Sequence, residues 1–500
     1  MAREQWGTRA GFIMAAIGSA IGLGNIWRFP YVAYDNGGGA FFLAYLFAML
    51  TAGIPLLLME FSIGQKFRGS SPLSFARINK KTEWLGWWQV AISFVVATYY
   101  SVIIAWALSY MVFSFNQSWG SDTQGFFLGD YLEATEAGVL GGLNGNVLIP
   151  LIIVWAGVFV IMLAGVKKGI EWANRIFIPL LVVMFLAIVV RALTLEGAVD
   201  GLDVFFRPDW QALAQPGVWV AAYGHIFFSL SIGFAIMITY ASYLPKKEDL
   251  NNSAFITAFS NGSFELLAGI GIFATLGFMA GNLGVPVAEV ATSGIGLAFI
   301  AIPEIINTMP GFNGLFGVLF FGCLVLAGIT SLISITETYI AGVQDKFKVS
   351  RTKSVIVGGG LSAIISLLYA TRGGINVLDA VDNFINQFGI AFAGLVSVII
   401  VAWILRKLDF LQGHMNEVSD FRIGSWWKFS LMFITPLVLG ANFVLALINN
   451  IRAPYEDMPL SFLAVSGWGV AGAALVVGLL LSLIKWPPGK LEAYKKEGGQ

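Results

Sequence analysis

The chain of 500 residues is poor in the side chains that carry most enzyme chemistry, with one cysteine and two histidines. The single cysteine, Cys323, excludes a disulfide within the chain, and two histidines argue against a zinc or multi-histidine centre. Charged residues make up only 12% of the sequence, compared with ~25% in soluble domains. The sequence has no P-loop and no segment that could hold a nucleotide-binding domain, which argues against an ATP-driven pump.

Long apolar stretches take the place of charged segments. Hydrophobic residues make up 57% of the chain. We count about twelve stretches of roughly 20 residues or more, each long enough to cross a bilayer. They lie at 8–34, 40–65, 86–115, 147–165, 170–193, 217–243, 252–281, 314–345, 354–371, 379–405, 425–448 and 459–485. The sequence therefore predicts one all-α polytopic membrane domain over residues 1–500.

The loops between the stretches differ in charge. Two long loops, 119–146 and 282–313, contain acidic residues and no basic ones. By the positive-inside rule, the basic loops and both termini of this multi-pass protein are expected on the cytoplasmic side of the cell membrane. The N-terminus has no small-residue cleavage site, so no removable signal peptide is expected. Most lysines and arginines lie in the loops 66–83, 166–168, 245–249, 345–353 and 406–428.

The first apolar stretch is interrupted by the run GSAIGLGN at residues 18–25. Each glycine disfavours helix by ~1 kcal/mol relative to alanine, and lipid cannot satisfy the backbone groups that a broken helix exposes. A break at membrane depth is typical of a transporter's binding site. The alternative is close helix packing, because Gly18 and Gly22 form a G-x-x-x-G face.

A second weak helix lies in the sixth stretch, where Ser229, Ser231 and Gly233 alternate with apolar residues. The first and sixth stretches each open a set of five, so the two breaks indicate an inverted repeat. The predicted halves are 8–193, with helices 1–5, and 217–405, with helices 6–10. Helices 11 and 12, at 425–485, lie outside the repeat.

The first interruption frees backbone polar groups of both kinds. Carbonyl groups near Gly18, Ala20 and Ile21 can ligate a hard cation, which prefers oxygen ligands. The N–H groups that follow, at Gly22 to Gly24, suit a carboxylate at the start of a half-helix. One break therefore offers acceptors to a cation and donors to an anion.

Three residues of the eighth stretch share one helical face, because Ala327, Thr330 and Ser331 stand at i, i+3 and i+4. Two interpretations are open. The hydroxyl groups can bond carbonyls of their own helix. Alternatively, they can face the freed carbonyls of the first break and complete a cation site with them.

Several motifs occur in an order that resembles one family. They are Gly18 to Pro30 followed by Asn36-Gly37-Gly38-Gly39-Ala40-Phe41, Gly53-Ile54-Pro55-Leu56 with Glu60, Tyr99-Tyr100, Phe227 to Ser231, Tyr240 to Tyr243 and Ala327 to Ser331. This set is similar to that of the neurotransmitter:sodium symporter family, over nearly the whole chain. The resemblance implies the fold of the bacterial leucine transporter, with a 5+5 inverted repeat and broken helices 1 and 6. It also implies sodium-coupled uptake of an amino acid, and the short termini resemble prokaryotic members.

The resemblance implies two sodium sites. The substrate carboxylate would complete the first, which would couple ion and substrate directly. The first site would contain the Ala20 carbonyl, Asn25, Ser229 and Asn261. The second, between spans one and eight, would contain Gly18, Ile21, Ala327, Thr330 and Ser331.

The same resemblance implies a substrate pocket around the two breaks, in which Tyr100 binds the substrate carboxylate. No charged side chain lines the inferred side-chain pocket, so we expect a neutral amino acid with a mostly apolar side chain. Taken singly, the apolar members are equally typical of a packed core. The pocket residues would be Ser19, Ala20, Gly22, Leu23, Gly24, Val96, Tyr100, Phe228, Ser229, Ser231, Phe234, Ser331 and Ile335.

Ionisable residues within membrane spans are functional candidates. Glu265 stands four residues after Asn261, on the same helical face. By resemblance, a carboxylate there replaces the chloride that other members bind, so transport should be independent of chloride. His225 is expected to pair with Glu265 and to influence its protonation, the alternative being a histidine bonded to another neighbour. Glu60 is expected to satisfy backbone near the first break.

Two pairs of charges are candidate gates. Arg28 and Asp382 would close the outer side, directly or through water. Arg3 and Asp345 would close the inner side, with Trp6 and Tyr243 packed beside them. The alternative for such pairs is a solvated surface contact contributing ~0–1 kcal/mol.

Together these features predict a sodium:amino-acid symporter that works by alternating access. It would be neither an enzyme nor a nucleic-acid-binding protein. Its partners would be the bilayer, sodium and the substrate, with no obligatory protein partner. A membrane receptor that binds the amino acid without moving it is the alternative, although the chain has no sizeable cytoplasmic domain.

Overall fold

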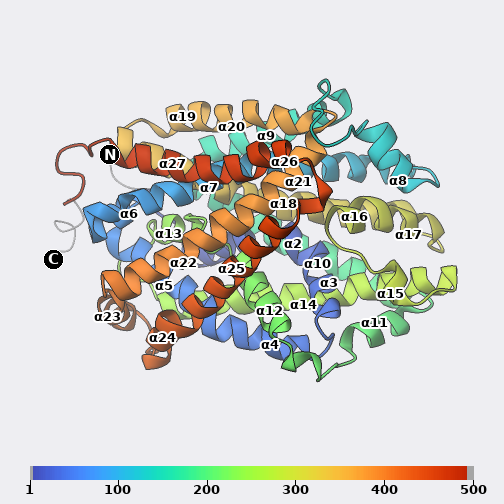
Figure 1. Ribbon diagram of the computed structural model, residues 1–500, viewed down its shortest axis with the longest axis horizontal. Helices are drawn as coiled ribbons and strands as arrows, with labels where there is room; N and C mark the ends of the chain where they lie inside the picture. Colours follow the sequence, from blue (N-terminus) through green and yellow to red (C-terminus); the bar gives the residue numbers. More distant parts are fainter. Residues whose placement is uncertain (1–3, 493–500) are drawn as a thin grey trace.

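The computed structural model describes residues 4–492, which form long helices running roughly along one axis of the molecule (Figure 1). The helices α6 (Ser71–Ile78) and α23 (Leu408–Val418) lie at one end, called here the α6 end. The helix α17 (Ile302–Thr308) lies at the other, called the α17 end. Both ends of the described chain reach the α6 end, where Arg77 of α6 donates to the Lys490 carbonyl at 2.7 Å.

Within residues 4–492, ten helices are long and apolar enough to cross a membrane. Their most apolar windows differ in burial, from 78% in Lys80–Phe113 and 72% in Asn313–Phe347 to 17% in Ser425–Asp457. The first two therefore form the centre of the bundle, and the last lies at its periphery. The other seven are Phe41–Phe67, Gly145–Leu163, Val166–Leu193, Leu250–Leu283, Arg351–Ala370, Gly374–Ile404 and Leu460–Leu483.

The two remaining predicted spans are broken helices, and each half is too short to cross a membrane alone. The first consists of α1 (Arg9–Ala20), α2 (Leu23–Trp27) and α3 (Phe29–Asp35). The second consists of α12 (Pro216–Ser229) and α13 (Ile236–Ala241). Ten continuous and two broken helices confirm the predicted fold class, with breaks in helices 1 and 6.

Several membrane helices change between α-helical and π-helical turns along their length. The α-helical segments are α4 (Phe41–Ala48), α5 (Ile54–Phe67), α7 (Glu83–Phe113), α9 (Gly145–Leu163), α10 (Trp172–Leu193), α14 (Leu250–Leu283), α18 (Asn313–Phe347), α19 (Arg351–Ser354), α20 (Gly360–Ser366), α21 (Gly374–Phe384), α22 (Phe392–Val398), α24 (Ser425–Phe429), α25 (Thr435–Arg452), α26 (Leu460–Leu463) and α27 (Val470–Leu483). The π-helical segments in the membrane helices are η1 (Met49–Gly53), η4 (Val166–Glu171), η7 (Val355–Gly359), η9 (Ile385–Ala391), η10 (Ile399–Ile404), η11 (Ser430–Ile434) and η13 (Ala464–Gly469), and two more, η3 (Phe126–Tyr131) and η6 (Leu297–Ala301), lie in the long loops.

The two long acidic loops carry short helices at the α17 end, as Figure 1 shows for α8 and α17. Pro286 and Pro303 stand at helix starts, where a missing N–H does little harm. The short helices of these and the other loops are α8 (Thr123–Gly125), α11 (Ala198–Phe206), α15 (Val287–Val290) and α16 (Gly294–Gly296), with the 3₁₀ turns η2 (Lys80–Thr82), η5 (Ala212–Ala214), η8 (Leu367–Ala370) and η12 (Tyr455–Asp457).

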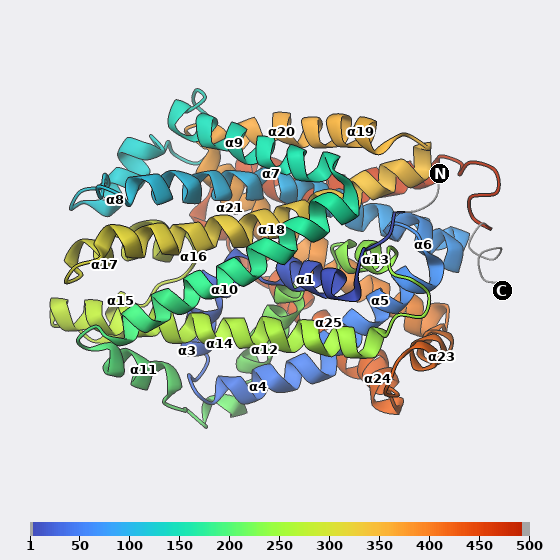
Figure 2. The same ribbon diagram turned by 180° about the vertical axis from the view of Figure 1, so that it is seen from behind.

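The broken helix α1 lies within the bundle (Figure 2). It packs against α10, α14 and α18, and it also contacts α13. The long helices α7 and α18 pack along each other behind it. This packing surrounds the first break with helices from both halves of the chain.

Candidate functional site

The first break occurs where the sequence predicts it. The helix α1 ends at Ala20, and Ile21 and Gly22 take extended backbone angles before α2 begins at Leu23. The last carbonyls of a helix have no partner within it. Near the middle of the bundle, the break therefore directs carbonyl groups of α1 and N–H groups of α2 toward one place.

The second break separates α12 from α13 over residues 230–235. Ser231, Gly233 and Ala235 have φ of +54°, +84° and +64°. For the two residues with a Cβ this conformation is costly, so the surroundings must hold it. Glu60 contributes, because its Oε1 accepts from the Gly233 N–H at 2.9 Å. The expectation that Glu60 serves the first break is wrong: α5 brings it to the second.

A hydrogen bond joins the two breaks. The Ser231 hydroxyl donates to the Ser19 carbonyl at 2.8 Å. This carbonyl belongs to the last turn of α1, where no helical N–H is available to it. The two unwound segments thus satisfy each other in the middle of the membrane region.

A cavity of about 570 Å³ opens beside the breaks and extends toward the α17 end as far as Tyr455 and Glu456. Every residue predicted for the substrate pocket lies on its wall. The part of the wall at the two breaks, called here the floor, contains apolar and hydroxyl side chains. The acidic and basic side chains of the described lining are Arg28, Asp379, Asp382 and Glu456. The wall residues from the prediction are Ser19, Ala20, Gly22, Leu23, Gly24, Val96, Tyr100, Phe228, Ser229, Ser231, Phe234, Ser331 and Ile335.

The start of α2 presents its N–H groups to the cavity side of the break. The Leu23 N–H donates to the Tyr100 hydroxyl at 3.3 Å. The Gly22 N–H donates to Asn25 Oδ1 at 2.8 Å. Because the Tyr100 hydroxyl accepts from Leu23, it keeps its own proton for an anionic group in the cavity.

Asn25, Ser229, Asn261 and Glu265 form a buried polar cluster behind this wall. Asn25 Nδ2 donates to Asn261 Oδ1 at 2.8 Å, and Asn261 Nδ2 donates to the Ser229 hydroxyl at 2.7 Å. The Ser229 hydroxyl donates to Glu265 Oε1 at 2.6 Å. The structure thus brings the side chains predicted for the first sodium site together around a carboxyl group. Neutral oxygens with one carboxylate are a donor set that suits a hard cation.

Glu265 has two further partners. His225 Nε2 lies 2.7 Å from Glu265 Oε1, as the sequence analysis expects. The Tyr45 hydroxyl donates to Glu265 Oε2, a contact that the sequence analysis missed. A buried tyrosine hydroxyl needs a partner, but the sequence alone gave no way to identify it. Asn25 Nδ2 also donates to Glu265 Oε1, at 3.0 Å, so that with Ser229 the carboxyl group has four side-chain partners.

The second predicted sodium site lies between α1 and α18, and its two hydroxyl groups differ. The Ser331 hydroxyl reaches across to the Gly18 carbonyl at 3.4 Å. The Thr330 hydroxyl bonds carbonyls of its own helix, those of Leu326 at 3.1 Å and Ala327 at 3.0 Å. The Thr330 hydroxyl thus bonds its own helix, whereas the Ser331 hydroxyl faces a freed carbonyl of the first break. The Ile21 carbonyl, just past the end of α1, belongs to the same region.

Arg28 and Asp382, the predicted outer gate, both line the mouth of the cavity. Within the described part of the chain no direct ion pair joins them. The Arg28 guanidinium lies over the Phe228 ring, 5.5 Å from its centroid. Asp382 Oδ1 accepts from the Tyr99 hydroxyl at 2.6 Å. The cavity accordingly remains open toward the α17 end.

The α6 end of the break is closed by the segment before α1. Trp6 is buried, its ring N–H donates to the Tyr240 carbonyl at 2.8 Å, and its backbone N–H donates to the Tyr243 carbonyl at 3.2 Å. Arg3 lies outside the described residues. Asp345, its predicted partner, binds Lys490 Nζ at 2.9 Å and the Ser70 N–H at 2.9 Å.

The sequence analysis missed a buried ion pair at this end. Glu337 Oε2 lies 2.8 Å from a guanidinium nitrogen of Arg351, and Glu337 Oε1 accepts from the Tyr243 hydroxyl at 2.5 Å. Arg351 also reaches Glu4, at 3.5 Å. An acid inside the eighth stretch was the available signal, because Glu337 lies six residues beyond Ser331.

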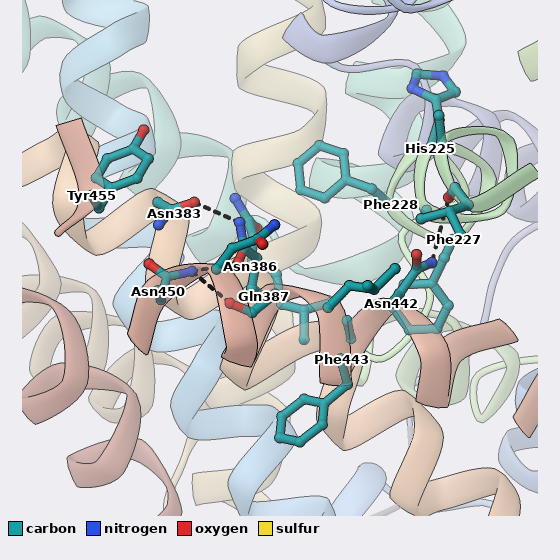
Figure 3. A pocket seen from close by; sticks show the side chains of 18 of the residues that line it. His225, Phe227, Phe228, Asn383, Asn386, Gln387, Asn442, Phe443, Asn450 and Tyr455 are labelled. Carbon is teal, nitrogen blue, oxygen red and sulfur yellow. Dashed lines mark hydrogen bonds between the residues drawn. The ribbon is translucent and has the colours of Figure 1, made fainter. Parts of the chain in front are cut away.

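A second cavity, of about 640 Å³, lies to the side of the first, between α12, η9 and α25. His225 and Phe228 line both cavities. Figure 3 shows its carboxamide side chains, with Gln387 bonded to Asn383 at 2.7 Å and to Asn450 at 3.3 Å. This amide chain links η9 to α25 beside the mouth of the main cavity.

The sequence matches the model of the "Sodium:neurotransmitter symporter family" over residues 3–137 and 120–487. It is 40% identical over 487 residues to the uncharacterized sodium-dependent transporter MJ1319 of Methanocaldococcus jannaschii, covering 97% of this chain and 98% of that protein. It is 32% identical over 504 residues to the sodium- and chloride-dependent creatine transporter 1 of Bos taurus, covering 91% of this chain and 78% of that one.

Among solved structures, the fold is similar to the crystal structure of MhsT in complex with L-phenylalanine. The TM-score is 0.75 and the sequence identity 34%, over 89% of this chain and all of the other. With its broken helices, its membrane spans and these similarities, the chain belongs to the sodium:neurotransmitter symporter family and is a polytopic sodium-coupled transporter.

Proposed function

We propose that this protein imports a neutral amino acid with a mostly apolar side chain, together with sodium and independently of chloride. The observation that carries the proposal is the pairing of donors and oxygen ligands at the first break. The N–H groups of α2 and the Tyr100 hydroxyl face the cavity, and the cluster of Asn25 and Ser229 lies behind them. A substrate carboxylate would bind the donors with one oxygen and a sodium ion with the other.

The neutral, apolar side chain follows from the cavity floor. Val96, Phe234 and Ile335 are at most 5% exposed. The polar side chains beside them in the cavity wall carry hydroxyl groups. A charged side chain buried there without a partner would be costly. MhsT, whose structure contains L-phenylalanine, supports the same class of substrate. One methylene changes affinity by only ~1–3 kcal/mol, so the pocket can accept several such amino acids.

Two sodium ions would bind, one on each side of the first break. The first would use the Ala20 carbonyl with Asn25, Ser229 and Asn261. The second would use the carbonyls of Gly18, Ile21 and Ala327, together with the hydroxyls of Thr330 and Ser331. The Ser331 hydroxyl bond to the Gly18 carbonyl joins the same two helices that this ion would join.

Chloride independence rests on Glu265. Its carboxyl group accepts from the Ser229 hydroxyl and from Asn25 Nδ2, at 2.6 and 3.0 Å. This carboxyl group would supply the negative charge next to the first sodium site. A protein that needed chloride would have to place the anion at this position, against that charge.

Transport would proceed by alternating access in the cell membrane, with the α6 end and both termini in the cytoplasm. The cavity opens toward the α17 end, so the structure corresponds to an outward-facing state in this orientation. Closure would bring Arg28 toward Asp382, and loss of the second sodium would release α1 from α18. Trp6 and its contacts with Tyr240 and Tyr243 would then separate.

Purified protein in liposomes tests this function. A thermal-shift screen of the twenty amino acids, with and without sodium, first identifies ligands. Uptake of the best ligand should then require an inward sodium gradient and persist when gluconate replaces chloride. Binding without uptake or counterflow would instead support a receptor, and stabilisation by charged amino acids only would contradict the proposed substrate class.

A further inference from the structure

Asn174, on the first turn of α10, has a buried amide oxygen without a partner. Its side chain is fully buried, and its Nδ2 donates to the Ile170 carbonyl at 2.9 Å. This bond fixes the orientation of the amide, because the reverse orientation would set two oxygens against each other. Oδ1 then points away from its own helix and finds no donor among the described residues. A buried acceptor in that condition is costly and needs an explanation.

The unpartnered oxygen faces Gly18 of α1. A Cβ added to Gly18 would lie 2.1 Å from Asn174 Oδ1, so the amide occupies the space that any side chain at this position would fill. The Gly18 carbonyl is an expected ligand of the second sodium, and it already accepts from the Ser331 hydroxyl at 3.4 Å. Asn174 thus approaches, from a third helix, the residue that α1 contributes to this site.

The helix α10 packs against both α1 and α18, the two helices between which the ion would bind. Just before α10, the buried Glu171 accepts from the Gly7 N–H at 2.6 Å and from the Thr8 hydroxyl at 2.9 Å. Residues 171 and 174 stand at i and i+3, on one side of the helix. The start of α10 therefore contacts α1 and the residues before it at two levels, through Glu171 at Gly7 and Thr8 and through Asn174 at Gly18.

We propose that Asn174 Oδ1 is a further oxygen ligand of the second sodium, directly or through one water. Sodium is a hard cation that prefers neutral and anionic oxygens, and this is an acceptor that no described protein donor satisfies. The ion would then bind three helices, α1, α10 and α18. Its departure would loosen α1 from α10 as well as from α18. This inference rests on the proposed sodium-coupled function.

A sodium titration without amino acid isolates this site, because the first site then lacks the substrate carboxylate. Purified protein is heated at increasing NaCl, with choline chloride holding the ionic strength constant. The readout is the sodium concentration that gives half of the maximal rise in melting temperature. The variants are Asn174→Leu, which has a similar shape without the oxygen, and Asn174→Ala, which is smaller and serves if the leucine variant does not fold. The control is Asn442→Leu on α25, a half-buried asparagine whose Nδ2 also donates to a backbone carbonyl, that of Val220 at 3.4 Å.

In both Asn174 variants we expect the half-saturating sodium concentration to rise about tenfold, the lower end of what outer ligands contribute to metal affinity. It should stay at the wild-type value in Asn442→Leu. If Asn174 has only a structural role, its replacement will lower the melting temperature in choline chloride and leave the half-saturating sodium concentration unchanged. That result would overturn this inference but not the proposed function. If sodium does not raise the melting temperature of the wild-type protein either, both this inference and the proposed sodium sites are wrong.

Discussion

Asn25 Nδ2 lies 3.0 Å from Glu265 Oε1. This contact joins the first break to α14 across 240 residues, and both residues are buried. It places the only carboxyl group of the described cluster directly behind the start of α2. A cation at this position would be compensated without any external anion.

Replacing this carboxyl group should change the ion requirement of transport. In Glu265→Ser, uptake should fall about tenfold when gluconate replaces chloride, equivalent to ~1.4 kcal/mol, and recover when chloride returns. The wild-type protein should be insensitive to the exchange. Glu304→Ser, which removes an acid from α17 far from the cluster, is the control. A chloride-insensitive Glu265→Ser protein would show that Glu265 does not supply this charge.

Two glycines of the first break should differ in their tolerance of a side chain. A Cβ at Gly22 would lie 3.1 Å from the Tyr100 hydroxyl and 3.2 Å from the Ser331 hydroxyl, whereas one at Gly24 would first meet Phe228 at 3.5 Å. Gly22→Ala should therefore weaken substrate binding about tenfold, ~1.4 kcal/mol, and Gly24→Ala much less. Isothermal titration or equilibrium binding in saturating sodium measures both. Equal losses in the two variants would mean that the space around Tyr100 does not limit binding.

The second break should depend on Glu60 for its stability. In Glu60→Ala the buried Gly233 N–H loses its acceptor, which we expect to cost ~1–3 kcal/mol. Glu60→Gln keeps a carbonyl oxygen in place and should lose less than half as much. Thermal unfolding in one detergent compares the variants with the wild type. If alanine and glutamine lower the stability equally, the hydrogen bond to Gly233 is not the source of the effect.

A histidine outside the membrane region should make the stability depend on pH. Burial in α23, with a smaller contribution from the positive charge of Lys66, lowers the pKa of His414 from 6.5 to about 4. Between pH 4 and pH 6.5, His414 binds a proton in the unfolded chain but not in the folded protein. The free energy of unfolding should therefore decrease as the pH falls from 6.5 to 4, by up to ~3 kcal/mol.

The variant His414→Gln isolates this effect, because glutamine does not titrate and can still bond Gln65, which His414 Nε2 contacts at 3.0 Å. The melting temperature of the wild-type protein should fall more steeply between pH 6.5 and 4 than that of His414→Gln, because only the wild type carries the imidazole that titrates in this range. Parallel curves over this range would contradict the assignment.

Much of the fold could be predicted because its causes are local. The length and hydropathy of each stretch indicate a membrane helix, and the glycines of residues 18–25 weaken one helix whatever surrounds it. The same holds for Ser229 to Gly233 in the sixth stretch. These features give the number of spans and the two breaks, and with the family resemblance they gave the residues that line the cavity.

Contacts between distant helices could not be predicted in the same way. The sequence drew attention to Glu60 and Asp345 as charged residues, but it assigned Glu60 to the wrong break and did not foresee that Asp345 binds Lys490. Tyr45 reaches Glu265 across 220 residues, and nothing in its neighbourhood along the chain indicates this. Which acceptor a buried donor finds depends on helix rotation and depth, which are set by packing.

The sequence by itself determined where the chain crosses the membrane and where two of its helices cannot continue, because hydropathy and helix propensity act within a few residues. Only the tertiary structure decided how the two breaks satisfy each other, through Ser231 and the Ser19 carbonyl. It also decided that Asn174 lies against Gly18. The physical reason is that a backbone group freed in an apolar interior must find its partner among whichever side chains the packing of remote helices brings within about 3 Å.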